Sequence, residues 1–170
     1  MSQLDDFRAA KDDSFRSDHH SPLTEEQRAK FTGLVYYDED PNFAYVLDPE
    51  PFAEQEAVEL QTSTGDTASQ VHWAKVRFLV MGEEAELTLF RSPDSGEIFL
   101  PFQDANAGGE TYGAGRYMEA QEHSSGKLLV DFNYAYNPYC AYNESWSCPI
   151  PPFENRLSVA IRAGEKTFPG

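Results

Sequence analysis

The side chains most suited to chemistry lie in two irregular segments, residues 102–117 and 131–157. The first, FQDANAGGETYGAGRY, holds four glycines within eight residues, and glycine inside a strand usually marks a bulge or the close approach of another backbone or a ligand. It also contains Arg116, whose rigid guanidinium fork suits a carboxylate. Two interpretations stay open for Arg116: it binds an anionic ligand, or it forms an internal salt bridge in a glycine-kinked barrel strand.

The second segment, DFNYAYNPYCAYNESWSCPIPPFENRL, begins where an apolar strand ends. Asp131 and Asn133 alternate with Val130 and Phe132, so the two polar side chains point to one face. On an open sheet that face meets solvent, but in a closed barrel it could line a cavity and supply polar ligand contacts. The prolines keep the following chain extended, and long loops without secondary structure are often functional.

These observations define a candidate pocket between residues 111–117 and the loop that begins at Asp131. In this hypothesis Arg116 anchors an anionic group, and Asp131 acts as an acid, a base or a hydrogen-bond acceptor. Further ligand contacts are expected from Tyr112, Asn133, Tyr136, Asn137 and Asn155. Among the other carboxylates near these segments, Glu110 is the next candidate because it opens the glycine-rich strand.

Cys140 and Cys148 are separated by seven residues, and three interpretations stay open. They are two buried thiols, inert or reversibly bridged; or a disulfide that closes a short loop; or part of a metal site. A metal site would need further ligands, and the four histidines are scattered, so no metal is predicted. No Cys–His arrangement for nucleophilic catalysis is legible, and no cofactor is implied.

Two short helices are predicted in the N-terminal part of the chain. In a helix over residues 2–16, four apolar side chains share one side: Leu4, Phe7, Ala10 and Phe15. A second helix is indicated after Thr24, which forms a capping box with Gln27, and Gly33 is the expected C-cap.

The remainder of the chain changes to the period of strands. Residues 69–81 and 85–89 alternate apolar and polar side chains around a turn at Gly82, which predicts a hairpin. Further strands are expected over Phe43–Leu47, Ala57–Thr62, Ile98–Phe102, Thr111–Glu119, Lys127–Ala135 and Leu157–Ile161. The expected fold is mainly β (α+β): two short N-terminal helices on an antiparallel barrel or sandwich, with a long proline-rich C-terminal loop. We expect one domain over residues 1–170, with a helical segment 1–33 and a β-rich core 43–166.

Composition narrows the function classes. The formal charge of −16, with 29 acidic and 13 basic side chains, repels nucleic acids and anionic membranes, so neither is an expected partner. The charged N-terminus and short apolar runs predict a cytoplasmic protein without a membrane span. An acidic excess with few lysines favours a salt-rich, halophilic source, although an ordinary acidic protein is the alternative.

Five motifs together resemble a known family: SPLTEEQRAKFTGLVYY, TYGAGRY, DFNYAYNPYCAY, CPIPPFENRL and IRAGEK. In this order they are similar to the uncharacterised family called domain of unknown function 1684, and the resemblance runs from the first helix to Lys166. The chain departs from the family pattern at residues 105–107 and at Phe153. The resemblance implies that the motif positions coincide with the two irregular segments, but it supplies no function.

Two functions therefore remain as hypotheses. In the first, the protein binds or converts a small anionic or polar ligand in the candidate pocket. In the second, the same polar residues fasten a proline-rich cap onto the barrel of a non-catalytic module, which acts on a protein partner. They differ in whether Arg116, Asp131 and Asn133 converge on an open cavity or on each other. Neither the oligomeric state nor catalysis itself is decided by the sequence.

Overall fold

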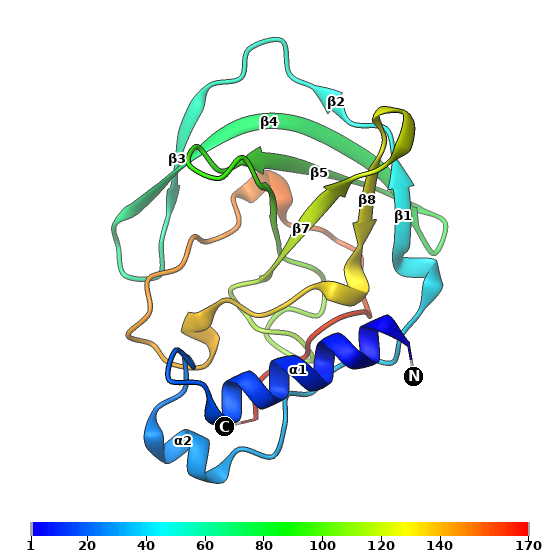
Figure 1. Ribbon diagram of the computed structural model, residues 1–170. Coiled ribbons are helices and arrows are strands. Elements are labelled where there is room, and N and C mark those ends of the chain that lie inside the picture. The colour runs from blue at the N-terminus through cyan, green and yellow to red at the C-terminus, as the bar shows by residue number, and fades with distance from the viewer. Residues whose placement is uncertain (1, 170) are drawn as a thin grey trace.

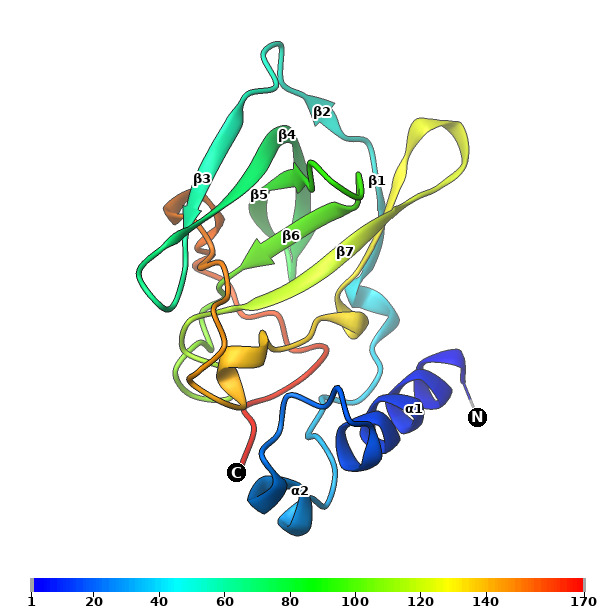
Figure 2. The ribbon, with the colours of Figure 1, turned by 60° about the vertical axis from the view of Figure 1, so that its left-hand side comes forward.

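The protein folds as one antiparallel sheet curved into a half-barrel, in a computed structural model that describes residues 2–169 (Figures 1 and 2). The strands are β1 (Ala44–Leu47), β2 (Glu50–Pro51), β3 (Ala57–Gln61), β4 (Thr67–Val80), β5 (Glu83–Arg91), β6 (Ile98–Phe102), β7 (Arg116–Glu122) and β8 (Leu128–Asp131). They pair in the order β1-β8-β7-β6-β5-β4-β2, with β3 also on β4. The predicted mainly β fold with two short helices is confirmed.

The hairpin of β4 and β5 is the longest feature of the sheet. Ala74, Val76, Phe78 and Val80 are buried on one face of β4, as the alternation predicts. The turn places Met81 and Gly82 at positive φ, which matches the right-handed twist of a tight hairpin. The sheet curves far enough for β1 to approach the end of β4, where the Tyr45 hydroxyl donates to the Leu79 carbonyl at 2.9 Å.

The open side of the half-barrel is filled by residues 156–166, which we call the C-terminal plug. A strand is predicted over Leu157–Ile161, but within residues 2–169 the plug forms no strand and has only isolated bridges, from Arg156 to Gln103 and from Glu165 to Tyr36. It runs beside residues 103–105 instead, where Leu157 N donates to Gln103 O and Ala105 N donates to Val159 O. The plug is extended because it crosses the barrel interior, and it inserts Val159, Ile161 and Ala163 into the core.

Two further strand predictions are too long at one end. β7 begins only at Arg116, because the chain before it turns at Gly115, where the φ is +104°. A Cβ at Gly115 would lie 2.6 Å from the carbonyl oxygen of Phe102, so the predicted close approach of a backbone is present here. β8 ends at Asp131, which accepts a hydrogen bond from Asn133 N and so starts a 3₁₀ turn, Phe132–Tyr134.

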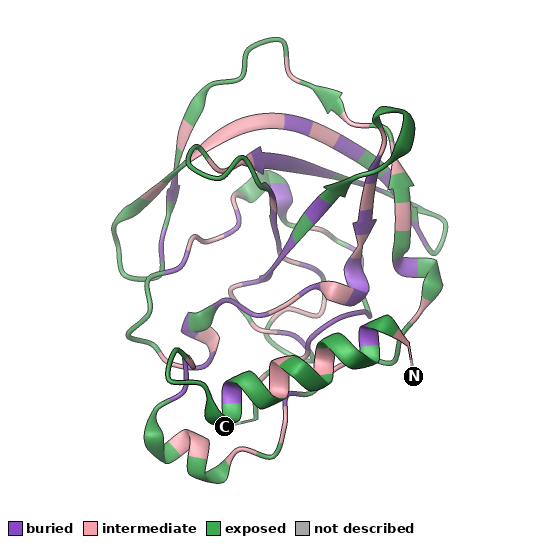
Figure 3. Ribbon diagram, in the orientation of Figure 1, coloured by how far each residue is buried: buried purple, intermediate pink, exposed green. Residues whose placement is uncertain are grey.

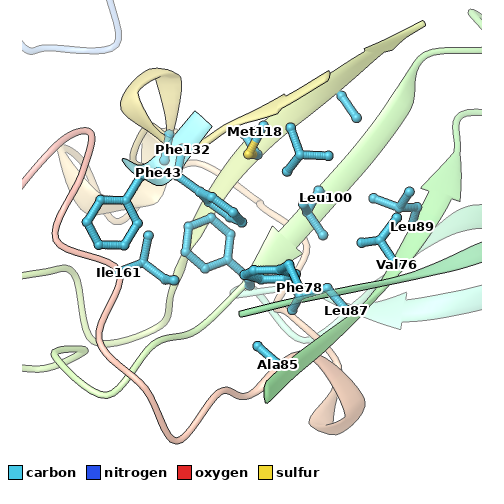
Figure 4. Close-up of a cluster of buried hydrophobic side chains, with 14 of the residues drawn as sticks. Phe43, Val76, Phe78, Ala85, Leu87, Leu89, Leu100, Met118, Phe132 and Ile161 are labelled. Atoms are coloured by element: carbon cyan, nitrogen blue, oxygen red, sulfur yellow. The ribbon is translucent and has the colours of Figure 1, made fainter. Parts of the chain in front are cut away.

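The main core lies between the concave face of the sheet and the plug. Figure 4 shows Ile161 of the plug near Phe78 and Leu100 of the strands and Phe132 of the 3₁₀ turn. Three phenylalanine rings meet here, with centroid distances of 5.5 Å between Phe78 and Phe132 and 5.3 Å between Phe102 and Phe132. Removing these rings and aliphatic chains from water supplies most of the favourable free energy that closes the half-barrel.

The helices are α1 (Gln3–Ser17) and α2 (Glu25–Lys30), and both begin with a capping box. The box predicted at Thr24 and Gln27 is confirmed, but α2 ends at Lys30 with Phe31 as its C-cap, so the prediction of Gly33 as C-cap is wrong. α1 lies across one end of the half-barrel (Figure 1), and its outer side is exposed (Figure 3). Within residues 2–169, no helix has both the length and the apolar character needed to cross a bilayer.

The prediction of which side chains α1 buries is only partly confirmed. Leu4 and Phe15 are buried, but Phe7 is 43% exposed. Between the two buried ends, the helix turns Arg8 and Lys11 inward, because carbonyl groups and a buried carboxylate lie beneath it. The spacing of apolar residues could not predict these inward-facing cations, because the middle of the inner face is polar.

Candidate functional site

Arg116 is buried, with 1% exposure, and its guanidinium binds the main chain of the plug. Nη1 donates to the carbonyl oxygens of Ala163 at 2.5 Å and Glu165 at 3.1 Å, and Nη2 donates to that of Ile161 at 2.9 Å. A rigid fork of five N–H donors can hold several carbonyls at once in a fixed geometry, whereas lysine has three donors on one freely rotating ammonium. Arg116 therefore holds the C-terminal half of the plug, residues 161–165, inside the barrel.

Asp104 supplies the countercharge to Arg116. Its Oδ2 lies 3.6 Å from Nη2 of Arg116 and accepts the N–H of Ile161 at 2.7 Å, while Oδ1 accepts from the Thr111 hydroxyl. Burial lowers the pKa of Arg116, and the charge of Asp104 opposes that shift. This is the internal salt bridge that was one of the two interpretations of Arg116. Glu110, by contrast, is exposed, and its carboxylate accepts from the Tyr37 hydroxyl.

Asn155, the residue immediately before the plug, is completely buried and binds two strands. Its Oδ1 accepts from Thr88 N at 2.7 Å, and its Nδ2 donates to the carbonyls of Thr88 at 2.8 Å and Pro101 at 2.7 Å. The side chain thus satisfies main-chain groups of β5 and β6 where no neighbouring strand does. No donor of this amide is left for a ligand.

Asp131 and Asn133 lie together, as expected, but they bind each other and the chain. Asp131 Oδ1 accepts from both the backbone N and the Nδ2 of Asn133, at 3.0 and 2.9 Å. The Asn133 amide also exchanges two hydrogen bonds with the main chain of Asp40, each 2.9 Å long. Asp131 and Arg116 share no partner among these contacts.

Asn137 belongs to a second buried polar cluster, centred on Glu165. The Glu165 carboxylate is fully buried and accepts from Lys11 Nζ at 3.0 Å, from Asn137 N and Nδ2, and from the Tyr142 hydroxyl. Burial raises the pKa of Tyr142 well above its ordinary value, and the charge of Glu165 adds to that shift. Lys11 comes from α1, so this carboxylate holds the N-terminal helix and the C-terminal loop together.

Tyr112, Tyr136 and the two cysteines form a third group, on the outer side of β7. Tyr136 donates its hydroxyl to Glu119, whereas the Tyr112 hydroxyl lies 3.7 Å from Cys140 Sγ. Burial, with the contact to Cys140, raises the pKa of Tyr112 to about 12. Both cysteines are free thiols, and within residues 2–169 no three His, Cys, Asp or Glu side chains are grouped as metal ligands.

Three surface cavities lie away from Arg116. A small one of about 250 Å³ beside α1 includes Asp131, and one of about 700 Å³ lies between α2 and the loop at Tyr142. The third, about 770 Å³, opens at the edge of the half-barrel between the β4–β5 hairpin and the plug. We call it the edge cavity, and it is lined by Arg77, Phe78, Leu79, Glu84, Ala85, Glu86, Arg156, Leu157, Ser158 and Val159.

The structure thus distributes the predicted site residues over several separate groups, in which most of their polar atoms bind the protein itself. Asp104, Glu165 and Lys11 are central to these groups and were not predicted. A signal for Lys11 existed, since Arg8 and Lys11 share one side of the first helix three residues apart. Glu165 lies in the motif IRAGEK, but nothing in the residue pattern indicates that Glu165 or Asp104 is buried.

Comparison with known proteins supports the fold and the family. Residues 29–166 match the family described as "Protein of unknown function (DUF1684)". A solution NMR structure of an uncharacterised protein from the halophilic archaeon Haloarcula marismortui is 38% identical, with a TM-score of 0.74, over 97% of this chain and 92% of that one. No curated protein matches the chain. Because the family match covers residues 29–166, most of the chain, the protein belongs to the DUF1684 family of proteins of unknown function.

Proposed function

We propose that the half-barrel binds a small amphipathic molecule with an anionic group in the edge cavity. One observation carries this proposal: a cavity of about 770 Å³ opens onto the apolar core and has on its rim an arginine, Arg156, that pairs with no carboxylate of residues 2–169. Its volume lies within the range of roughly 300–1,000 Å³ that is usual for small-molecule sites. The ligand class is the anionic one expected from the sequence, at a different arginine.

The floor of the edge cavity is apolar. Phe78, Ala85 and Val159 line it, and each is between 6% and 7% exposed, so they reach the cavity from the edge of the main core. Leu157 and the exposed Leu79 extend this apolar surface toward the rim. An apolar body of a ligand would cover these side chains and gain the free energy of removing them from water.

The rim carries charge that can bind an anion. Arg77 is already paired with Glu50 and Glu86. Arg156 forms no ion pair with any carboxylate of residues 2–169, and its guanidinium lies 5.6 Å from the ring of the exposed Phe153. The five donors of Arg156 are therefore free for a carboxylate, sulfonate or phosphate group.

Local charge at the edge cavity differs from that of the whole chain. Its lining holds two arginines and two glutamates, whereas the chain has 29 acidic and 13 basic side chains. An anion approaching this rim therefore meets much less repulsion than elsewhere on the surface. The lining contains no histidine or cysteine, so we propose binding and not catalysis.

The test uses 1-anilinonaphthalene-8-sulfonate, an amphipathic anion whose emission rises in apolar surroundings, and decanoate as a non-fluorescent competitor. We expect saturable binding to the native protein and displacement by decanoate. Arg156→Gln removes the charge-assisted contact and should weaken binding by at least about tenfold, since such contacts contribute roughly 1.5–3 kcal/mol. Ser158→Trp should block the cavity mouth and abolish binding.

Arg28→Gln is the matched control. Arg28 lies in α2, also has no ion pair within residues 2–169, and lines none of the three cavities. This variant should bind both molecules as the wild type does. Equal affinity of the Arg156→Gln variant and the wild type, or no saturable binding to the native protein, would overturn the proposal.

A further inference from the structure

The two cysteines meet in the folded protein, although they are separated by seven residues. Cys140 lies in a 3₁₀ turn, Tyr139–Ala141, and its backbone N–H points to Cys148 Sγ at 3.4 Å. Cys140 and Cys148 also belong to one buried cluster, together with Tyr117. The side chains are 7% and 8% exposed, so they are shielded but still reachable by a small reagent.

The surrounding residues hold this pair in place. Ser63, in the loop after β3, donates its N–H to the Cys148 carbonyl at 2.9 Å and accepts the Cys148 N–H on its hydroxyl at 3.1 Å. On the other side the Tyr112 hydroxyl lies 3.7 Å from Cys140 Sγ. Separate elements therefore hold the two cysteines beside each other, with the Cys140 N–H directed at the Cys148 sulfur.

We propose that Cys140 and Cys148 are a thiol-oxidation site that forms a reversible intramolecular disulfide when the protein meets a peroxide. This inference is independent of the ligand proposed for the edge cavity. No other residue is required, since a nucleophilic thiol and a resolving thiol are both present.

The chemistry balances with hydrogen peroxide as the oxidant. The Cys140 thiolate attacks one peroxide oxygen, the O–O bond breaks, and a sulfenic acid forms; the departing hydroxide takes up the proton that the Cys140 thiol had released and becomes water. The Cys148 sulfur then displaces the hydroxyl from Cys140, which leaves as a second water. In total two thiols lose two electrons and two protons, and one peroxide is reduced to two waters.

Cys140 is the better nucleophile of the two. The hydrogen bond from the Cys148 thiol lowers the pKa of Cys140, with smaller contributions from Tyr112 and Ser63 that also favour the thiolate. The same hydrogen bond raises the pKa of Cys148, which therefore stays protonated and acts second. The order of the two steps follows from this asymmetry.

Oxidation would close a ring of residues 140–148 on which the N-terminal helices rest. The Tyr142 carbonyl accepts from Gln27 Nε2 at 2.6 Å, and Trp146 Nε1 donates to the Pro22 carbonyl at 3.2 Å. The ring of Tyr142 also packs on Phe15 of α1, with centroids 5.0 Å apart. A disulfide would make this support more rigid, so the docking of α1 and α2 should become more stable.

The experiment treats the reduced full-length protein with hydrogen peroxide and measures intact mass and peptide maps. We expect the loss of two hydrogen atoms, a peptide linkage between Cys140 and Cys148, and full reversal by dithiothreitol. Oxidation should raise Tm by about 5–10 °C, because it closes a short loop of the unfolded chain.

Single variants separate the two roles. Cys148→Ser should accumulate a sulfenic acid at Cys140 that dimedone traps, whereas Cys140→Ser should react more slowly by at least tenfold. A disulfide between two molecules, direct conversion of either cysteine to sulfinic acid, or no change of mass in excess peroxide would overturn the proposal. The mass measurement on the native chain needs no variant, so a folding defect in either one leaves the test intact.

Discussion

Two arginines, Arg116 and Arg156, lie in the same half-barrel under opposite conditions. Arg116 is buried, and its guanidinium binds three carbonyls and Asp104. Arg156 is exposed at the rim of the edge cavity and has no carboxylate partner within residues 2–169. Both arginines lie in motifs quoted above, TYGAGRY and CPIPPFENRL, so the difference teaches that burial, and not membership of a motif, separates an arginine that binds the main chain from one whose guanidinium stays at the surface.

The largest effect should come from removing the buried arginine. Arg116→Met leaves Asp104 as an uncompensated buried charge and frees three carbonyls of the plug, so we expect a loss of about 3–5 kcal/mol in the free energy of unfolding. Urea denaturation measures it. The exposed Arg162→Met is the matched control and should change stability by less than about 0.5 kcal/mol. Similar effects of the two substitutions would remove the contrast on which the comparison depends.

A glycine of the plug provides the next test. Gly164 has a φ of +83°, and a Cβ there would lie 2.7 Å from the carbonyl oxygens of both Ala135 and Phe132. Gly164→Ala should therefore destabilise the protein by roughly 2–4 kcal/mol, from backbone strain and overpacking together. Gly65→Ala has the backbone strain without the contact, because nothing lies within 4 Å, and should lose only about 1 kcal/mol. Equal losses would show that the plug is loosely seated.

Stability at alkaline pH tests the burial of two tyrosines, Tyr117 and Tyr142. Burial raises the pKa of Tyr142 and of Tyr117 above the ordinary value of about 10. The folded state then keeps protons that the unfolded state loses, so stability is complete below pH 10 and falls as the pH rises above it. Each tyrosine should contribute a slope of about 1.4 kcal/mol per pH unit. Urea denaturation between pH 9 and 11 measures this slope, and Tyr142→Phe should reduce it; an unchanged slope would contradict the burial of that phenol.

The smallest effect on stability should come from replacing Arg156, the exposed arginine of the comparison. Arg156→Gln removes no ion pair among the described residues and leaves the plug in place, so the free energy of unfolding should change by less than about 0.5 kcal/mol. Thermal and urea denaturation without ligand would check this. A loss near that of Arg116→Met would mean that Arg156 is structural and would weaken the case for a ligand.

The sequence predicted the regular elements better than the site. Alternating residues placed β4 and its partner correctly, because one face of that hairpin packs on the core and the other faces solvent. The strand prediction for Leu157–Ile161 is wrong. An extended segment shows the same alternation of apolar residues whether it pairs with a neighbouring strand or lies inside the barrel. The C-terminal loop was correctly singled out as irregular.

The polar partners could not be inferred because they depend on long-range contacts. Glu165 meets Lys11 across 154 positions of the chain, and Asn155 binds groups of β5 at Thr88. Residue type alone does not distinguish an arginine that binds carbonyls from one that binds a ligand. Burial decides between them, and burial is a property of the folded chain.

The location of ligand binding tests the central claim most directly. Two-dimensional ¹H–¹⁵N NMR spectra of the labelled protein, titrated with decanoate, would report which amides sense the ligand. We predict the largest shifts at residues 84–86 and 156–159, which line the edge cavity, and little change around Arg116. Shifts centred on residues 111–117 and 131–137 would place the ligand in the pocket expected from the sequence and contradict this account.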